Sequence, residues 1–250
     1  GIPVRTGWKG EMRYGLLNDL RVLDKERYPL MIERFMALAY PAGTELPQPY
    51  PRPHLDIDQT EREQALSAFA LEVGDRPVLA LCPGAEFGDA KRWPAQHYAQ
   101  VAEAKIREGW QVWIFGSKTD HPGGEDIRDA LIPGLREEVY NLAGETSLAQ
   151  AIDLMSCATA VVSNDSGLMH VAAALNLPLV AVYGSTSPEF TPPLADQVTM
   201  VRTGIECSPC FDRTCRFGHY DCLRLLQPAL VIDALTDLVG TPLSLQEFSI

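Results

Sequence analysis

The chain has 250 residues, of which 46% are hydrophobic and 22% charged, as is usual for a globular protein. Its 33 acidic and 21 basic residues give a net charge of −12, which argues against general nucleic-acid binding because that function favours a positive field. No apolar run reaches the roughly 18 residues that a membrane-spanning helix needs, and the basic N-terminus lacks the apolar segment of a signal peptide.

The first 58 residues differ in pattern from the rest of the chain. Residues 11–43 are typical of loop and helix, and the segment LPQPYPRPHLDI at 46–57 is a proline-rich connector. No alternation of strands and helices precedes this connector. We therefore expect residues 1–58 to be the C-terminal end of one domain with its linker, and residues 59–250 to form a second domain.

From residue 78 onward, apolar strand patterns alternate with helix patterns. We expect strands at 78–82, 111–115, 160–163 and 179–183, and helices at 94–109, 147–158 and 167–176. Continuous apolar strands separated by helices predict a parallel sheet covered on both faces. The fold class is therefore α/β, with a Rossmann-like, doubly wound parallel sheet.

The loop CPGAEFGDAKRWP follows the first of these strands. In open α/β sheets, ligands bind where the C-terminal strand ends lead into helices. Gly84 and Gly88 allow a close backbone approach to a ligand, and Lys91 and Arg92 stand just before the next helix. Cations at a helix N-terminus are unfavourable by themselves, so an anion between them and the helix amides would explain the pair. The alternative is a solvated basic turn.

A second polar loop, NDSG at 164–167, interrupts the pattern between an apolar strand and a helix. Asp165 or Ser166 is suited to cap the helix, Gly167 leaves the first amides open, and His170 lies on the same helix face as Ser166. The alternative is an ordinary capped helix with a core histidine. Because this loop and the Lys91 loop open at the same sheet edge, together they predict a diphosphate site.

Two further loops are weaker candidates. In NLAGETSL, Thr146 or Ser147 is expected to cap a helix, and the backbone there to border a flat base; a plain helix cap is the alternative. The segment FGSKTD ends another strand and offers Asp120 to a ribose hydroxyl.

Four of the six cysteines gather near the C-terminus. Cys207, Cys210, Cys215 and Cys222 have the spacing of a small metal knuckle for zinc, with His219 as a spare ligand. Free thiols in a loop are the simpler alternative, and disulfides would need an oxidising compartment. We expect a reducing one.

With these motifs in view, the chain resembles the ADP-heptose–lipopolysaccharide heptosyltransferases of glycosyltransferase family 9, most closely their type II branch. The resemblance runs through nearly the whole chain, in the segments RTGWKGEMRYGLLND, CPGAEFGDAKRWP, NLAGETSL, NDSGLMHVAAAL and VYGSTSPEFTPP. It implies the two-domain GT-B architecture, in which the N-terminal domain binds the acceptor and the C-terminal domain binds the nucleotide-sugar. Residues 1–58 would then be the end of the acceptor domain.

The resemblance also implies a reaction and assigns donor residues. Heptose would be transferred with inversion from ADP-heptose to the lipopolysaccharide inner core, with no obligatory metal or other cofactor. Lys91 would contact the diphosphate, and Asp165 the sugar; both would be catalytic. The remaining donor contacts would be Gly84 and Ala85 in the phosphate loop, Thr146 near adenine, Asp120 at the ribose, and Ser166, Gly167 and His170 around the phosphates and ribose.

On the acceptor side, the resemblance implies that Arg13 contacts anionic groups of the inner core. The family's presumed general base lies on a strand and glycine-rich loop before the point where this sequence starts, so the base is not assigned. The expected setting is the cytoplasmic face of a Gram-negative inner membrane, with peripheral contact through the lipid acceptor. Two alternatives are a protein that binds ADP-sugar without transferring it, and another heptosyltransferase of the family.

Overall fold

The structure is a computed structural model that describes residues 1–240, and the chain divides into two compact units. Residues 1–52 and 187–192 form the first, and residues 53–186 and 193 onward form the second. No helix within residues 1–240 is both long and apolar enough to cross a membrane.

The first unit is small and contains a short parallel strand pair. Strand β1 (Thr6–Trp8) pairs with β2 (Asp19–Arg21), and helix α1 (Met31–Ala39) follows. The segment 187–192 joins this unit through a hydrogen bond from the Met31 amide to the Phe190 carbonyl, 2.9 Å long. The sequence predicted only loop and helix here, because three-residue strands are too short to give a recognisable alternation.

The second unit is built on a six-stranded parallel sheet. Its strands are β3 (Val78–Cys82), β4 (Gln111–Ile114), β5 (Val139–Asn141), β6 (Ala160–Asn164), β7 (Leu179–Val182) and β8 (Val198–Val201), in the spatial order β5-β4-β3-β6-β7-β8. Every residue of β3, β4, β6 and β7 is buried. Apolar side chains on both sides of a strand need cover on both faces, so the predicted doubly wound sheet is confirmed.

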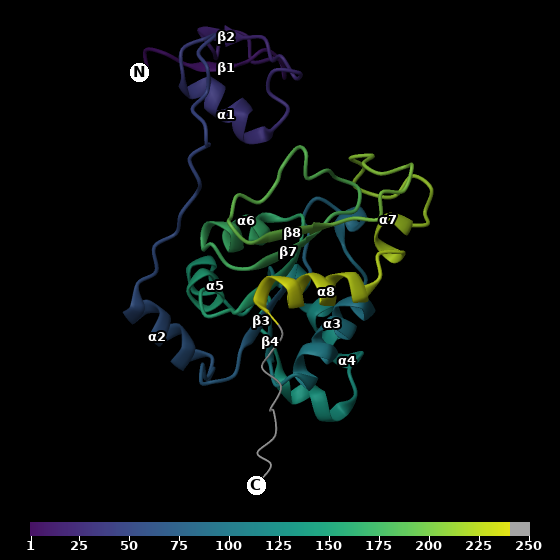
Figure 1. The fold of residues 1–250 in the computed structure, drawn as a ribbon. Helices are drawn as coiled ribbons and strands as arrows, with labels where there is room; N and C mark the ends of the chain where they lie inside the picture. The colour runs from purple at the N-terminus through teal and green to yellow at the C-terminus, as the bar shows by residue number, and fades with distance from the viewer. Residues whose placement is uncertain (241–250) are drawn as a thin grey trace. The chain divides into compact units, whose positions relative to one another are not determined.

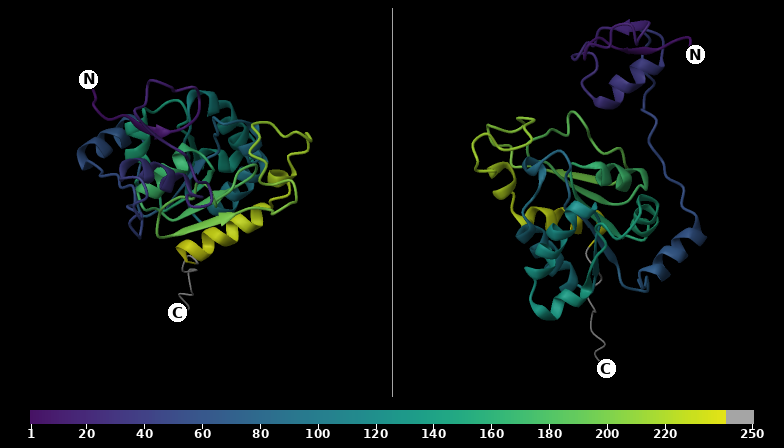
Figure 2. Two further views of the ribbon diagram at one scale, coloured as in Figure 1. Left: turned by 90° about the horizontal axis from the view of Figure 1, so that it is seen from above. Right: turned by 180° about the vertical axis from the view of Figure 1, so that it is seen from behind.

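Helices cover the two faces of this sheet in separate groups (Figure 1). One core cluster joins α3 (Ala95–Arg107), α4 (His121–Asp129) and α8 (Pro228–Val239), and α8 runs beside β8 (Figure 2). The other core cluster joins α2 (Gln59–Ala68), α5 (Leu148–Met155) and α6 (Gly167–Ala174). The short elements are η1 (Asp89–Lys91), η2 (Lys118–Asp120), η3 (Pro133–Glu138) and α7 (Asp221–Arg224).

Local signals account for the ends of the predicted helices. Ser147 caps α5, because its hydroxyl accepts the Gln150 amide at 3.2 Å while Gln150 Oε1 accepts the Ser147 amide at 2.9 Å. Gly109 follows the end of α3 with a positive φ of 91°, as a helix-terminating glycine does. Pro94 is the N-cap of α3, one position before the first helical residue.

The winding of the chain through the sheet changes direction between β3 and β6. From β3 the chain continues outward through β4 and β5, and from β6 it continues outward on the other side through β7 and β8. In open α/β folds, ligands bind at such a switch point, outside the carboxyl ends of the strands. Two of the predicted ligand-binding loops leave these two strands, residues 83–94 after β3 and residues 165–166 after β6. The fold therefore brings them to the same place.

Candidate functional site

Lys91 and Asp165 meet across the switch point. Lys91 Nζ lies 2.7 Å from Asp165 Oδ2 and donates a second, longer bond of 3.3 Å to the Asp165 carbonyl. Their side chains are only 14% and 5% exposed. Separating a buried pair of opposite charges leaves each charge uncompensated, so the pair links the loop after β3 to the loop after β6.

Thr186 is a third member of this cluster, and sequence analysis did not single it out. It follows β7, and its hydroxyl donates to Asp165 Oδ2 at 2.6 Å. Lys91 and Thr186 therefore share one oxygen of the carboxylate. The segment VYGSTSPEFTPP pointed to this loop, but nothing in the sequence says that Thr186 faces Asp165.

The start of α6 is open on its first turn. Ser166 occupies the predicted N-cap position, but within residues 1–240 no amide of the first turn donates to its side chain. Asp165 does not cap the helix either, because its carboxylate turns toward Lys91 and Thr186. Gly167 is exposed. This arrangement leaves the helix start available to an anion.

His170 lies on α6, one turn after Ser166, with an exposed side chain. Its pKa is lowered from the ordinary value of 6.5, chiefly because the surrounding protein disfavours the charged ring; Asp165 raises this pKa and Lys91 lowers it. The imidazole therefore interacts electrostatically with both members of the Lys91–Asp165 pair. At neutral pH the ring is uncharged and has one donor and one acceptor nitrogen.

The two glycines of the loop that begins at Pro83 lie close to atoms of other loops. A side chain at Gly84 would place its Cβ 2.5 Å from Asp120 Oδ2, and one at Gly88 would collide with the carbonyl of Arg213. Neighbouring protein atoms are therefore enough to require glycine at both positions, and the close approach of a ligand to this loop stays a prediction. Ala85, the other predicted phosphate-loop residue, is buried.

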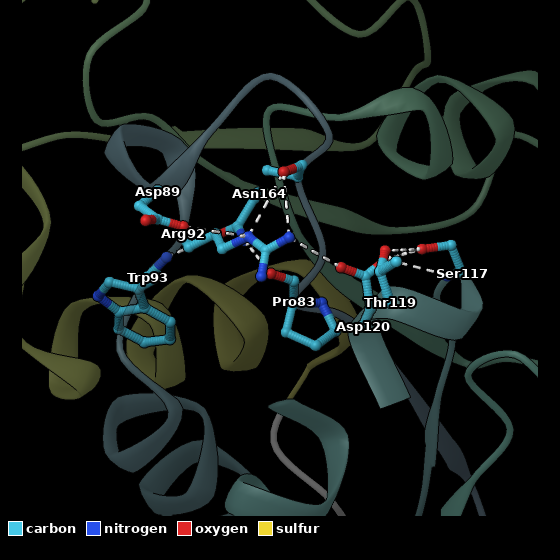
Figure 3. A network of polar contacts seen from close by, with 9 residues as sticks. Pro83, Asp89, Arg92, Trp93, Ser117, Thr119, Asp120 and Asn164 are labelled. Atoms are coloured by element: carbon cyan, nitrogen blue, oxygen red, sulfur yellow. Dashed lines mark hydrogen bonds and ion pairs between the residues drawn. The ribbon is translucent and has the colours of Figure 1, made fainter. Parts of the chain in front are cut away.

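The Arg92 side chain points away from the Lys91–Asp165 pair, although Arg92 directly follows Lys91 in the sequence. Its guanidinium donates to the Ala85 carbonyl at 3.4 Å and to Asp120 Oδ1 at 3.2 Å (Figure 3). Asp120 is only 8% exposed, and its other oxygen, Oδ2, accepts the Ser117 amide at 2.9 Å and the Ser117 hydroxyl at 2.6 Å. Asp120, the residue predicted to bind ribose, thus accepts hydrogen bonds from protein donors on both of its carboxylate oxygens.

Asn164 connects the same loops from the end of β6, immediately before Asp165 (Figure 3). Its amide nitrogen donates to the Pro83 carbonyl at 2.5 Å, and its oxygen accepts the Trp93 amide at 3.2 Å and the Tyr98 hydroxyl at 3.0 Å. The side chain is fully buried. Asn164 therefore holds both ends of the loop that carries Lys91, and sequence analysis did not identify it.

A cavity of about 490 Å³ lies beside this network, next to the start of α3. Pro83, Gly84, Arg92 and Asp120 are among its lining residues, and Tyr220 and Arg224 border it from the α7 side. Its volume is within the range of small-molecule sites. Arg92, Asp120 and the start of the loop after β3 therefore line the same cavity.

The remaining predicted contacts lie elsewhere. Thr146, half-buried, precedes the α5 cap in the loop after β5. Arg13 belongs to the first unit, where its guanidinium donates to the Trp8 carbonyl at 3.2 Å and lies 3.6 Å from the Glu11 carboxylate.

For the cysteine cluster, the sequence left two interpretations open, a zinc knuckle and free thiols in a loop. All six cysteines lie within the described residues and are free, and residues 1–240 hold no group of three or more His, Cys, Asp or Glu side chains arranged to bind a metal. Cys222 packs into the core through α7, and burial, reinforced by the charges of Cys210, Cys207 and Cys215, raises its pKa to about 11. By contrast, the Tyr220 amide and neighbouring amides lower the pKa of Cys215.

The sequence is similar to known heptosyltransferases. Residues 1–221 match the family glycosyltransferase family 9 (heptosyltransferase). The chain is 55% identical to lipopolysaccharide heptosyltransferase 2 of Escherichia coli over 207 residues, which cover 81% of this chain and 59% of that protein. The chain thus spans less than two thirds of the length of this curated relative.

Solved structures agree with the sequence comparison. The E. coli ADP-heptose lps heptosyltransferase II superposes with a TM-score of 0.85 at 49% identity, over 96% of this chain and 70% of that one. The E. coli heptosyltransferase WaaC with ADP shares the fold, with a TM-score of 0.57 at 19% identity over 88% of this chain and 60% of that one. The family match over residues 1–221 and the close type II relatives lead to one conclusion: this chain belongs to glycosyltransferase family 9, the heptosyltransferases.

Proposed function

We propose that this chain carries the donor-binding part of a lipopolysaccharide heptosyltransferase of type II. The enzyme would transfer L-glycero-D-manno-heptose from ADP-heptose to the inner core of lipopolysaccharide, with inversion at the anomeric carbon. The observation that carries the proposal is the buried Lys91–Asp165 pair at the switch point, beside the open start of α6. The similarity to E. coli ADP-heptose lps heptosyltransferase II supports the choice of donor.

The chemistry follows from the charges at this site. A base removes the proton of an acceptor hydroxyl, the hydroxyl oxygen attacks the anomeric carbon from the face opposite ADP, and the bond to the diphosphate breaks. Negative charge then grows on the leaving diphosphate. Lys91 and the amides at the start of α6 meet that charge where it develops, and therefore stabilise the transition state more than the ground state.

The other site residues would hold the donor in position. We assign the sugar to Asp165, whose Oδ2 is already held by Lys91 and Thr186, so that Oδ1 is the oxygen directed to a sugar hydroxyl. Ser166, Gly167 and His170 would surround the phosphates and the ribose. Gly84 and Ala85 would form the phosphate loop, and the backbone near Thr146 would border adenine; the ribose contact of Asp120 stays a prediction.

The acceptor side and the cellular setting are also proposals. Arg13 would contact anionic groups of the inner core, and the lipid acceptor would bring the enzyme to the cytoplasmic face of the inner membrane. No metal is assigned to the reaction, because Lys91 and the helix amides supply the positive charge that a leaving diphosphate requires.

A transfer assay tests this function. The chain, supplied together with a complete acceptor domain, is incubated with ADP-heptose and a truncated inner-core acceptor, and the acceptor is analysed by mass spectrometry, with a UDP-sugar in place of ADP-heptose as the control. The proposal expects the mass of one heptose residue to be added, and ADP to be released, with ADP-heptose only. Donor binding without any transfer would instead favour a protein that only binds ADP-sugars.

A further inference from the structure

We infer that Arg92 acts with Asp120 as a positioning residue that fixes the phosphate loop, and that it is not a second phosphate ligand beside Lys91. The inference rests on the proposed function, because it concerns how the same donor site is held in shape. In the sequence, Lys91 and Arg92 are equivalent candidates for binding an anion. In the structure they point to different partners.

The two adjacent cations diverge because η1 ends between them. Lys91 is the last residue of η1, and Arg92 follows with extended backbone angles, φ −91° and ψ 109°. Lys91 Nζ reaches Asp165 at 2.7 Å, whereas the Arg92 guanidinium reaches Asp120 at 3.2 Å. The first pair joins the loops after β3 and β6, and the second joins the loops after β3 and β4.

Asp120 is a fixed anchor for Arg92. Ser117 donates twice to one of its oxygens, through the amide and the hydroxyl, so the carboxylate is held at the start of η2. Its carboxylate also occupies the space where a side chain at Gly84 would lie. A carboxylate that is 8% exposed needs a compensating charge, and Arg92 supplies it.

Arg92 in turn fixes the direction of a peptide group in the phosphate loop. Two nitrogens of its guanidinium, Nε and one Nη, lie 3.4 Å from the Ala85 carbonyl. In a trans peptide the C=O and the following N–H point in opposite directions, so this contact directs the Glu86 amide away from Arg92. An amide whose direction is fixed before the ligand arrives binds an anion without reorganisation.

The opposing view is that Arg92 itself binds phosphate. Its side chain is 40% exposed and borders the cavity next to α3, so a ligand could reach it. The two views differ in a measurable way. If Arg92 acts through Asp120, the effects of removing either residue are not additive; if Arg92 binds phosphate, they are nearly independent.

The experiment is a calorimetric titration of the 250-residue chain with ADP. The variants are Arg92→Gln, Arg92→Lys, Asp120→Asn and the double variant Arg92→Gln/Asp120→Asn. Arg107→Gln is the matched control, because Arg107 is an exposed arginine of α3 that pairs with Glu103, away from the loop. Melting temperatures are recorded for each variant, so that a loss of affinity is compared only among folded proteins.

The inference predicts that Arg92→Gln and Asp120→Asn each weaken ADP binding about tenfold, and that the double variant is no weaker than about tenfold. Arg92→Lys should stay within about threefold of Arg92→Gln, because one ammonium group cannot span both the Ala85 carbonyl and Asp120. The control should stay within about twofold of the wild type.

Other outcomes overturn the inference in distinguishable ways. A loss near a hundredfold in the double variant, or wild-type affinity in Arg92→Lys, would make Arg92 a direct phosphate ligand. Wild-type affinity in all variants would remove the pair from the donor site and leave the proposed function standing. No binding of ADP by the wild-type chain would overturn the proposed function and this inference together.

Discussion

The Asp165 carboxylate is held by two residues that are distant from it in sequence. Lys91 and Thr186 both donate to Oδ2, and the side chain is 5% exposed. A carboxylate has about four acceptor positions, so those on Oδ1 are the ones available to a ligand. The role that we propose for Asp165, contact with the sugar, therefore depends on Lys91 for charge and on Thr186 for direction.

Replacing Lys91 tests the proposed diphosphate contact. Lys91→Ala removes the charge that would meet the diphosphate, and a hydrogen bond to a charged group is worth about 1.5–3 kcal/mol. We expect the affinity for ADP to fall about 10- to 100-fold in a calorimetric titration of the folded variant. Lys25→Ala, at an exposed lysine of the first unit, is the control. Unchanged affinity in Lys91→Ala would remove Lys91 from the donor site.

His170 predicts a pH dependence of donor binding. Its pKa in the free protein is lowered, chiefly because the surrounding protein disfavours the charged ring, so the ring is neutral at pH 7. A diphosphate beside the ring favours the charged form and raises the pKa on binding. Binding should therefore take up a proton, and affinity for ADP-heptose should rise as the pH falls from about 7.5 to about 6.

The measurement for His170 is calorimetry in two buffers of different ionisation enthalpy. ADP-heptose is the better ligand here, because its diphosphate is esterified at both ends and does not titrate in this range, whereas the terminal phosphate of ADP does. His170→Gln, which cannot be protonated, should show neither proton uptake nor the rise in affinity. Equal proton uptake by this variant and by the wild type would show that another group is responsible.

At the scale of secondary structure, Asn164 joins the end of β6 to both ends of the loop after β3. Asn164→Ala removes the buried hydrogen bonds to the Pro83 carbonyl, the Trp93 amide and the Tyr98 hydroxyl, and only the hydroxyl keeps another bond, 3.4 Å long, to the Cys82 carbonyl. Each unsatisfied group costs about 1–3 kcal/mol, partly relieved by rearrangement, so we expect the free energy of unfolding to fall by about 2–4 kcal/mol. Urea unfolding measures it.

A matched substitution at an exposed residue distinguishes loss of the Asn164 hydrogen bonds from the general effect of removing a side-chain amide. Gln100 lies on the exposed side of α3, and Gln100→Ala should change the free energy of unfolding by less than about 0.5 kcal/mol. If Asn164→Ala were as mild as this control, the hydrogen bonds of Asn164 would not be holding the two loops together.

The elements that sequence predicted well are those with long apolar runs. The strands of the central sheet were found because almost every residue in them is apolar and buried. Helix α4 was missed because its first turn, His121-Pro122-Gly123-Gly124, resembles a loop, and only packing against α3 and β5 holds it as a helix. Strand β8 was missed because it lies at the edge of the sheet and is only partly buried.

The candidate site was predictable in part for the same reason. Lys91, Asp165 and Ser166 directly follow recognisable strands, so their shared location followed from the parallel sheet. Thr186 and Asn164 could not be recognised, because their roles depend on contacts across 21 and 71 residues of sequence. The cysteine spacing suggested a metal site, but spacing alone does not bring the four thiols together around one ion.

At the scale of the whole molecule, an acidic protein is proposed to bind an anionic donor. The net charge of −12 repels such a ligand, so binding must depend on local positive groups. Lys91 and the start of α6 provide them at the switch point, where the sheet topology brings two loops together. The chain spans 59% of its E. coli relative, and the loops that we propose to bind the donor lie in its larger unit, residues 53–186 and 193 onward.

The most direct test of the account is a calorimetric titration of this chain with ADP, with UDP as the control. Family 9 membership and the Lys91–Asp165 site predict binding of ADP in the micromolar range and much weaker binding of UDP. Equal binding of both nucleotides would contradict selective recognition of an ADP-linked donor. Absence of heat with either ligand would contradict the assignment of the donor site to these loops.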